Sequence, residues 1–188
     1  MSGSHGKSAG LGKEQNESVG ITDGAALQWF AVQTRYRFEK KVAAQLSQKK
    51  LGVYLPLRSE NHSWSDRRVI VTTPLFPGYA FVKIDRSYIM REAVLKTEGM
   101  IGFVSFGGTV VPVPPEQIEH LQLLLQTKVP FSLSAFAHVG QRVRIRGGSL
   151  HGLEGVLLQR DKGKLMISIE AIQRSLAIEL QGYELDLV

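Results

Sequence analysis

The stretch PLFPGYAFV, at residues 74–82, is the most informative segment of this 188-residue chain. It places three aromatic residues, Phe76, Tyr79 and Phe81, within six positions. A Pro-Gly pair predicts a tight turn, and a strand that begins at the glycine presents Tyr79 and Phe81 on the same face, because side chains alternate along a strand. Neighbouring aromatic side chains on one sheet face are typical both of a protein-recognition surface and of a hydrophobic core.

A strand and an amphipathic helix precede this stretch. The segment WFAVQT is mostly apolar and predicts a central strand. Phe38, Val42 and Leu46 follow at spacings of four, so they share one face of a helix that we expect to end at Gly52. VYLPL then predicts a short strand broken by proline, and the polar run at residues 59–68 predicts a loop or hairpin tip.

The same alternation of strands and helices continues downstream. RVIVTT and GYAFVKI predict strands, and Asp85 is the expected cap of a helix that runs to about Lys96, with Tyr88, Ile89 and Leu95 facing inward. IGFVSFGGTVVPV predicts a hairpin that turns at its glycine pair, and a proline then opens a final helix. This order predicts a ferredoxin-like α/β sandwich with an antiparallel sheet.

The sequence pattern divides the chain into four regions. We expect a disordered tail, the sandwich domain, a linker and a small barrel domain, at residues 1–27, 28–126, 127–137 and 138–188. The last region carries several short strands with glycine turns, in which apolar residues alternate with polar ones. The predicted fold class is therefore α+β.

Composition excludes several classes of protein. There is no cysteine, which excludes a disulfide scaffold and thiolate metal sites, and no apolar run reaches the roughly 18 residues of a membrane-spanning helix. The five histidines lack metal-ligand spacing, and no nucleophile motif is present. We therefore expect no enzyme, no catalytic residue, no cofactor and no metal, but a cytoplasmic monomer without a membrane partner.

The net charge of +6 is concentrated in one segment. Residues 29–60 hold seven basic side chains against two acidic ones, which favours a nucleic-acid partner, although a solvated helix face fits equally well. The candidate nucleic-acid-facing residues are Arg35, Arg37, Lys41, Lys49, Arg67 and Arg68.

Together these segments resemble the NusG family of transcription elongation and antitermination factors over residues 28–188. WFAVQTRYRFEKKVAAQL resembles the opening of the family's N-terminal domain, and PLFPGYAFV resembles that domain's most recognisable motif. VGQRVRIRGGSLHGLEGVL resembles the KOW motif, which opens an SH3-like barrel in the family. The matching KOW positions are Val143, Ile145, Gly148, Gly152 and Gly155.

The resemblance implies a protein that binds RNA polymerase across its clamp and reduces pausing and termination. The implied clamp-binding residues are Gln33, Phe76, Pro77, Tyr79 and Phe81. The implied second polymerase contact loop is Met90, Arg91 and Glu92. The basic helix is implied to face the non-template DNA strand near the upstream fork.

A loop of the barrel separates subgroups of the family. Housekeeping members carry an aromatic–glycine pair there, which contacts the termination factor Rho and a ribosomal protein. In this chain Ile172, Gln173 and Arg174 occupy that place, which favours a specialised, operon-targeted member similar to RfaH. A housekeeping factor that couples polymerase to Rho or the ribosome, and a ribosome-associated KOW protein that binds RNA, remain alternatives.

Some specialised members refold the barrel into a helical hairpin that masks the aromatic patch. The alternating Val and Ile residues of the final segment favour strands, so we expect a stable barrel on a flexible tether.

Overall fold

A five-stranded antiparallel sheet organises the N-terminal part of the chain. Its order is β2 (Gly52–Tyr54), β5 (Tyr79–Ile84), β1 (Gln28–Thr34) and β6 (Met100–Phe103), and β9 (Pro112–Val113) also pairs with β1. The predicted strand WFAVQT is thus central. The structure is a computed structural model and describes residues 26–64, 67–127, 129–137, 139–158 and 163–188. The predicted tail lies almost wholly outside the described residues.

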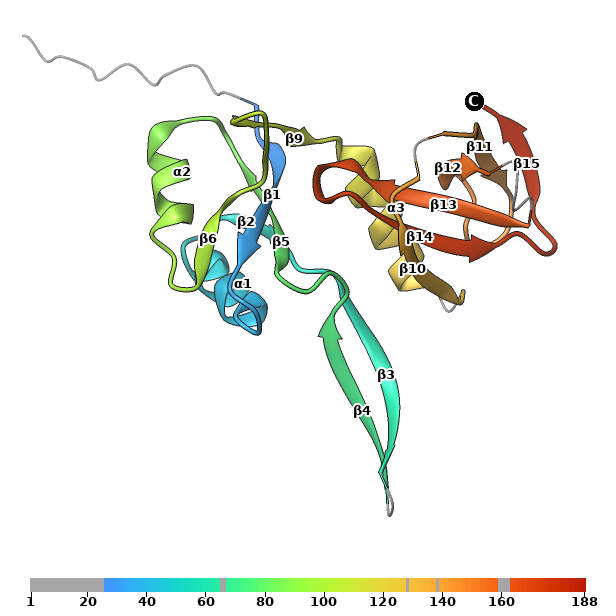
Figure 1. Ribbon diagram of the computed structural model, residues 1–188, viewed down its shortest axis with the longest axis horizontal. Helices are drawn as coiled ribbons and strands as arrows, with labels where there is room; N and C mark the ends of the chain where they lie inside the picture. Colours follow the sequence, from blue (N-terminus) through green and yellow to red (C-terminus); the bar gives the residue numbers. More distant parts are fainter. Residues whose placement is uncertain (1–25, 65–66, 128, 138, 159–162) are drawn as a thin grey trace, which may run out of the picture.

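Two helices cover one face of this sheet (Figure 1). α1 (Glu39–Gln48) and α2 (Tyr88–Leu95) pack against β1 and β5. Val42, Leu46 and Val94 are fully buried there. They pack with alternate residues of both strands: Phe30 and Val32 of β1, and Ala80, Val82 and Ile84 of β5. The predicted inward face of the first helix is confirmed.

The end of α1 differs from the prediction. The helix stops at Gln48, and Lys50 adopts a positive φ of 60°, whereas Gly52 is already the first residue of β2. A Cβ at position 52 would lie 2.9 Å from the Cβ of Lys83. The glycine therefore allows two strands to approach closely and does not terminate the helix.

Helix α2 differs in its cap and in its buried face. Ser87, and not Asp85, is the N-cap, because its hydroxyl accepts a hydrogen bond from the Met90 N–H at 3.3 Å. Val94 faces the sheet, and Met90 packs at its edge. The prediction of the inward face was wrong for three residues, whose side chains are exposed: Tyr88, Ile89 and Leu95.

A third helix crosses the other face of the sheet. α3 (Pro115–Gln126) begins with a proline in its first turn, as predicted. Ile118, Leu121 and Leu124 are buried along it, and Leu125 is half-buried. The predicted hairpin before this helix is present. It consists of β7 (Ser105–Phe106) and β8 (Thr109–Val110), which are joined through Gly107 and Gly108, two glycines of positive φ.

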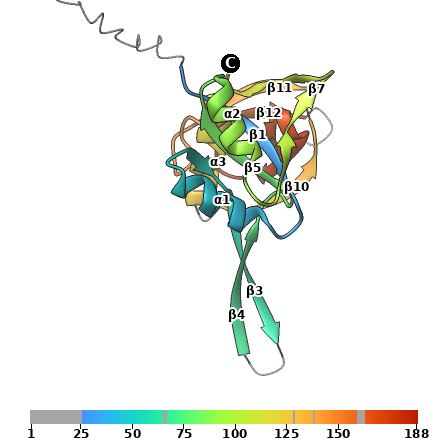
Figure 2. The same ribbon diagram turned by 90° about the vertical axis from the view of Figure 1, so that its left-hand side faces the viewer.

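A long two-stranded ribbon projects from the body of the molecule (Figures 1 and 2). It consists of β3 (Leu57–Trp64) and β4 (Arg67–Pro74), which pair over their whole length from Leu57–Pro74 to Trp64–Arg67. The sequence predicted a hairpin tip at residues 59–68, and the structure extends it into eight residues on each side. Because an isolated two-stranded ribbon is marginally stable, its anchorage at the base matters.

The C-terminal part is a six-stranded antiparallel barrel sheet. Its order is β10 (Phe131–Ala135), β14 (Arg174–Glu179), β13 (Lys164–Ile169), β12 (Glu154–Leu157), β11 (Gln141–Arg146) and β15 (Glu184–Leu187). The barrel therefore keeps its strands and is not a helical hairpin. The expected linker at residues 127–137 contains β10, which pairs with β14 along all five of its residues. The sequence pattern also predicts a turn at residues 161–163, most of which lies outside the described residues.

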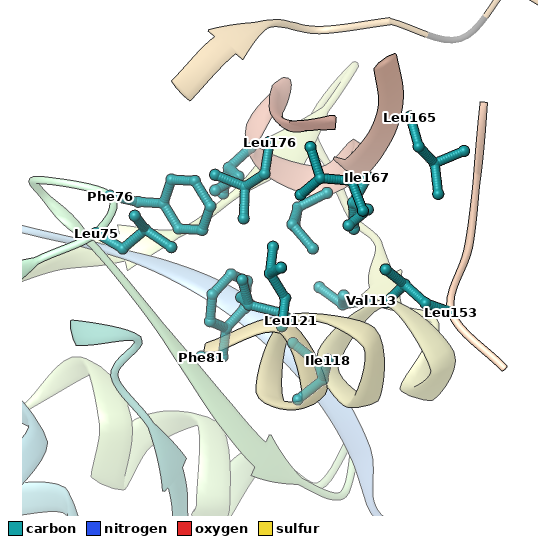
Figure 3. Close-up of a cluster of buried hydrophobic side chains, with 14 of the residues drawn as sticks. Leu75, Phe76, Phe81, Val113, Ile118, Leu121, Leu153, Leu165, Ile167 and Leu176 are labelled. Carbon is teal, nitrogen blue, oxygen red and sulfur yellow. The ribbon is translucent and has the colours of Figure 1, made fainter. Parts of the chain in front are cut away.

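The barrel packs on α3 and on the second face of the N-terminal sheet. One cluster of buried side chains runs from Phe81 and Ala31 of the sheet through Leu121 to Ile167 and Leu176 of the barrel (Figure 3). The short helix η1 (Glu170–Ile172) lies against β1 and β9. In this arrangement the barrel is docked, in contrast to the expected flexible tether.

Candidate functional site

The segment Leu75–Tyr79 forms a turn that is fixed at both ends. The Tyr79 N–H donates to the Phe76 carbonyl at 3.1 Å, and the Leu75 N–H donates to the Pro56 carbonyl at 2.8 Å. Gly78 has a φ of 82°, which a side chain rarely adopts. Its N–H donates to the carboxylate of Glu39 at 2.7 Å, so the first turn of α1 holds the Pro-Gly turn in place.

The aromatic side chains of this segment come together on the second face of the sheet. Phe81 stacks on Tyr54 with ring centres 6.4 Å apart, and Tyr79 belongs to the same cluster. Gln33 and Pro77 are exposed at the rim, and the Gln33 amide lies 3.5 Å from the Tyr79 hydroxyl. The structure therefore brings together all five residues of the predicted clamp-binding set, which we call the aromatic patch: Gln33, Phe76, Pro77, Tyr79 and Phe81.

The docked barrel covers most of the aromatic patch. Phe76 and Phe81 are 3% and 0% exposed, and Figure 3 shows the Phe76 ring pointing toward Leu176 of β14. A cavity of about 450 Å³ nevertheless remains between the patch and the barrel, lined by Phe76, Tyr79, Leu133 and Arg174 among others. The barrel therefore packs closely on the centre of the patch and leaves open space over its rim.

The same contact buries one residue of the predicted partner loop of the barrel, Ile172. Ile172 is 4% exposed at the end of η1, and Gln173 follows with a φ of 51°. The Glu170 N–H donates to the side-chain amide of Gln117 on α3 at 3.2 Å, which ties the loop to the N-terminal part. Gln173 and Arg174 remain exposed. Each part of the chain therefore covers the apolar recognition surface predicted for the other.

The predicted basic face of α1 is divided between structural and exposed residues. The Lys41 ammonium pairs with Glu98 at 2.7 Å, and the Lys49 ammonium donates to Ala93 O and Thr97 Oγ1 at 2.7 and 2.8 Å. These two lysines connect α1 to the segment around α2. Arg35 and Arg37 are exposed in the turn before α1. Arg67 and Arg68 begin β4 at the far end of the ribbon, and their side chains lie outside the described part.

The predicted second contact loop is part of helix α2. Met90 is half-buried against the sheet, and the Arg91 guanidinium lies 5.7 Å from the centre of the Phe103 ring. Glu92 pairs with Lys96 at 2.9 Å, and this hydrogen bond and charge lower the pKa of Glu92. Only Arg91 of the three is exposed, so the most accessible apolar side chains of α2 are two that the sequence had assigned to the core: Tyr88 and Ile89.

The KOW positions serve the architecture of the barrel. Val143 and Ile145 are buried in its core, and Gly148 and Gly152 have φ values of 70° and 84°. A Cβ at Gly155 would lie 2.6 Å from the Met166 carbonyl, so only glycine allows that strand approach. The intervening arginines of β11 pair across the sheet with two carboxylates, which neutralises much of this face: Arg142 and Arg144 with Glu154, and Arg146 with Asp186.

Two titratable groups lie at half-buried positions of the interface. Burial raises the pKa of the Tyr54 phenol beneath Phe81 to about 12. His120 of α3 faces the barrel, and burial lowers its pKa although Glu154, Glu119 and Glu116 act in the opposite direction. The neutral forms of both side chains are therefore favoured in the docked arrangement.

The described residues offer no obvious place for a metal or a membrane span. Within residues 26–64, 67–127, 129–137, 139–158 and 163–188, no group of three His, Asp or Glu side chains could hold a metal ion. In the same ranges no helix has the length and apolar character required to cross a bilayer.

The fold and its surfaces define a class: a binding protein with an α/β sandwich and a docked β-barrel. Residues 27–122 match the NusG family, described as "Transcription termination factor nusG". The chain belongs to this family.

Curated relatives agree with this assignment over nearly the whole chain. The transcription termination/antitermination protein NusG of Lactococcus lactis is 27% identical over 184 residues, which cover 92% of this chain and 97% of that protein. The NusG of Borreliella burgdorferi is 25% identical over 173 residues, which cover 81% and 94%. The solved structure "Domain interaction in Thermotoga maritima NusG" matches with a TM-score of 0.50 at 23% identity, covering 86% of this chain and 97% of that chain, and supports the fold. The chain is a NusG-like transcription termination/antitermination factor.

Proposed function

We propose that this protein binds RNA polymerase through the aromatic patch and reduces pausing and termination. Family membership supports the transcriptional role, and the patch supplies the surface. The observation that carries the proposal is the clustering of Phe76, Tyr79 and Phe81 on one sheet face beside the exposed Gln33 and Pro77. Such an apolar centre with a polar rim is the usual anatomy of a protein-binding surface.

The mechanism requires no covalent chemistry. A factor that binds the closed clamp more tightly than the open one shifts polymerase toward the closed, transcribing state. The exposed basic residues at the start of α1 face the non-template DNA strand in this proposal, and Arg91 of α2 belongs to the second polymerase contact. We place this activity in the cytoplasm, in the sandwich domain at residues 28–126, and the barrel at 138–188 carries the partner loop.

Docking makes polymerase binding conditional in this proposal. Phe76 cannot contact a partner while Leu176 lies against it, so the barrel must leave the patch first. The free energy of docking is then subtracted from the free energy of polymerase binding. Release also frees Ile172, so the partner of the barrel and the polymerase both favour the same undocked state.

The finer role we propose is that of a specialised, operon-targeted factor. The partner loop supports this role, because Ile172 and Gln173 stand where a housekeeping factor carries an aromatic–glycine pair. Pull-down of Rho or of a ribosomal protein by the undocked chain would contradict the specialised role and favour the housekeeping one.

The direct test measures binding to purified core RNA polymerase. Phe81 is a poor position for mutation, because its complete burial means that alanine would destabilise the fold by about 3–5 kcal/mol. We therefore use Tyr79→Ala, combined with an undocking substitution such as Ile172→Asp. Tight binding by Ile172→Asp that is lost when Tyr79→Ala is added supports the proposal, and equal binding by both variants refutes it.

A further inference from the structure

A cavity of about 340 Å³ lies beside α2, on the helix-covered face of the N-terminal sheet. Its floor is apolar, because Phe30 and Ile84 are 4% and 0% exposed and Phe103 stands edge-on to Phe30 with ring centres 6.1 Å apart. The β7–β8 hairpin forms another wall at residues 108–110. A cavity of this volume with an aromatic floor is typical of a site for a small molecule.

Two arginines line the cavity, and a neutral group holds each of them. The Arg91 guanidinium lies 5.7 Å from the centre of the Phe103 ring, and the Arg86 Nε donates to the Gln28 side-chain oxygen at 3.0 Å. Neither contact neutralises the positive charge. A guanidinium carries five N–H groups, so both arginines keep donors for another partner.

This arrangement differs from that of other arginines on the surface. Within the described part of the chain, neither Arg86 nor Arg91 pairs with a carboxylate. Three arginines elsewhere do: Arg58 with Glu60, Arg144 with Glu154, and Arg146 with Asp186. The acidic residue of the cavity, Asp85, accepts a hydrogen bond from the Ser87 N–H at 2.9 Å, and the lining keeps a net positive charge.

We propose that this cavity binds a small organic anion that carries a planar ring, with its carboxylate or phosphate held by Arg86 and Arg91. The planar fork of a guanidinium matches either anion through two parallel hydrogen bonds. Side chains that are already held in place lose little freedom on binding, which favours affinity. The ring of the ligand would lie against the apolar floor and the hairpin. An aromatic acid and a nucleoside monophosphate both have this chemistry.

The cavity is open to such a ligand while the barrel is docked. Its lining, within the described residues, comes from the sheet, the start of α2 and the hairpin, and includes no residue of the aromatic patch. Arg91 also belongs to the second polymerase contact of the proposed function. A ligand that holds Arg91 would weaken that contact, and this consequence, unlike the binding itself, rests on the proposed function.

The test titrates the full-length protein at low salt and follows its backbone amides by nuclear magnetic resonance. The probes form two matched pairs, adenosine monophosphate with adenosine and benzoate with benzamide. At least one anion should shift the amides of Arg86, Thr109 and Val110 with a dissociation constant below about 1 mM. Its neutral partner should bind at least about tenfold more weakly, because the charged hydrogen bonds are lost. Tighter binding of one anion identifies the nucleotide or the aromatic acid as the source.

One substitution and a matched control separate the site from general attraction of anions. Arg86→Gln removes the charge at an exposed position and should weaken binding about tenfold without changing the melting temperature. Lys83→Gln removes a neighbouring cation of β5 that lies outside the cavity, 5.8 Å from the centre of the Trp29 ring. This control should change binding by less than about twofold.

Several results would overturn the inference. It fails if neither anion shifts these amides, if adenosine and benzamide bind as tightly as the anions, or if Lys83→Gln weakens binding as much as Arg86→Gln. Shifts confined to Arg35 and Arg37 before α1 would also overturn it, because they would show attraction to exposed charge outside the cavity. The titration contains no polymerase, so a failure of the proposed function in the polymerase assay leaves its result unaffected.

Discussion

Ile172→Asp should undock the barrel without unfolding it. Ile172 is 4% exposed and lies at the end of η1, against β1 and β9 of the N-terminal part. Burial of an isoleucine side chain contributes about 1.5–3 kcal/mol, so its loss should shift the docking equilibrium by roughly 10- to 150-fold toward the undocked state. A buried carboxylate adds a desolvation penalty, so these figures are lower limits.

Two measurements check this prediction. Small-angle X-ray scattering should give a larger radius of gyration for Ile172→Asp, because two tethered bodies occupy more space than one docked body. The affinity for core RNA polymerase should rise by up to the same factor, because the binding-competent fraction rises. The control is Leu187→Asp, which places the same charge at a position of β15 that is 71% exposed.

The reasoning would be refuted by a compact Ile172→Asp protein with unchanged polymerase affinity. It would also be refuted if Leu187→Asp expanded the molecule equally, because the effect would then come from charge and not from the loss of docking. A loss of strand content by circular dichroism would show instead that Ile172 stabilises the barrel itself. That result would contradict the assignment of this side chain to the contact between the two parts.

Three further predictions concern titration and packing. Tyr54 has a pKa of about 12 in the folded protein, so its contribution to stability is complete below pH 10 and is lost as the pH rises toward 12; Tyr54→Phe should flatten the fall of melting temperature in that window. Burial lowers the pKa of His120, so docking should weaken as the pH falls below about 6.5, and scattering should show expansion that His120→Gln removes. Gly155→Ala should prevent the barrel from closing, since the new Cβ would lie 2.6 Å from the Met166 carbonyl, and nuclear magnetic resonance spectra should show lost dispersion for barrel residues only.

Local patterns predicted the central strand, the inward face of α1 and the fold class. Each depends on periodicity within one element, such as the spacing of Val42 and Leu46, and such periods are fixed by the geometry of the backbone. The face of α2 was not predictable in the same way. An eight-residue helix has few apolar positions, and which of them face the sheet depends on how the helix packs in the fold. Val94 packs against the sheet, and Tyr88 and Ile89 are exposed.

Two strands escaped prediction for different reasons. The alternation in FSLSA was available in the sequence, with Phe131 and Leu133 separated by serine, but its shortness made it look like a linker. The ribbon strand β3 is almost entirely polar and lacks any apolar period. Its length follows from pairing with β4, which is a property of two segments together and not of either alone.

The candidate site shows the same division between local and tertiary information. The sequence pattern was enough to predict that Phe76, Tyr79 and Phe81 lie close together, because they belong to one turn and the strand that follows it. It could not choose between a core and a recognition surface, because that choice depends on whether the barrel occupies the patch.

The two interfaces of the N-terminal part differ in what docking does to them. The aromatic patch is covered at its centre, whereas Arg35 and Arg37 stay exposed in the turn before α1. Under the proposed function we therefore expect DNA to reach these arginines before the barrel is released, and polymerase to reach Phe76 only afterwards. Single-strand binding should consequently be equal in the wild type and in Ile172→Asp, while polymerase binding differs between them. A large gain in single-strand affinity on undocking would contradict this order, because it would show that the barrel also covers these arginines.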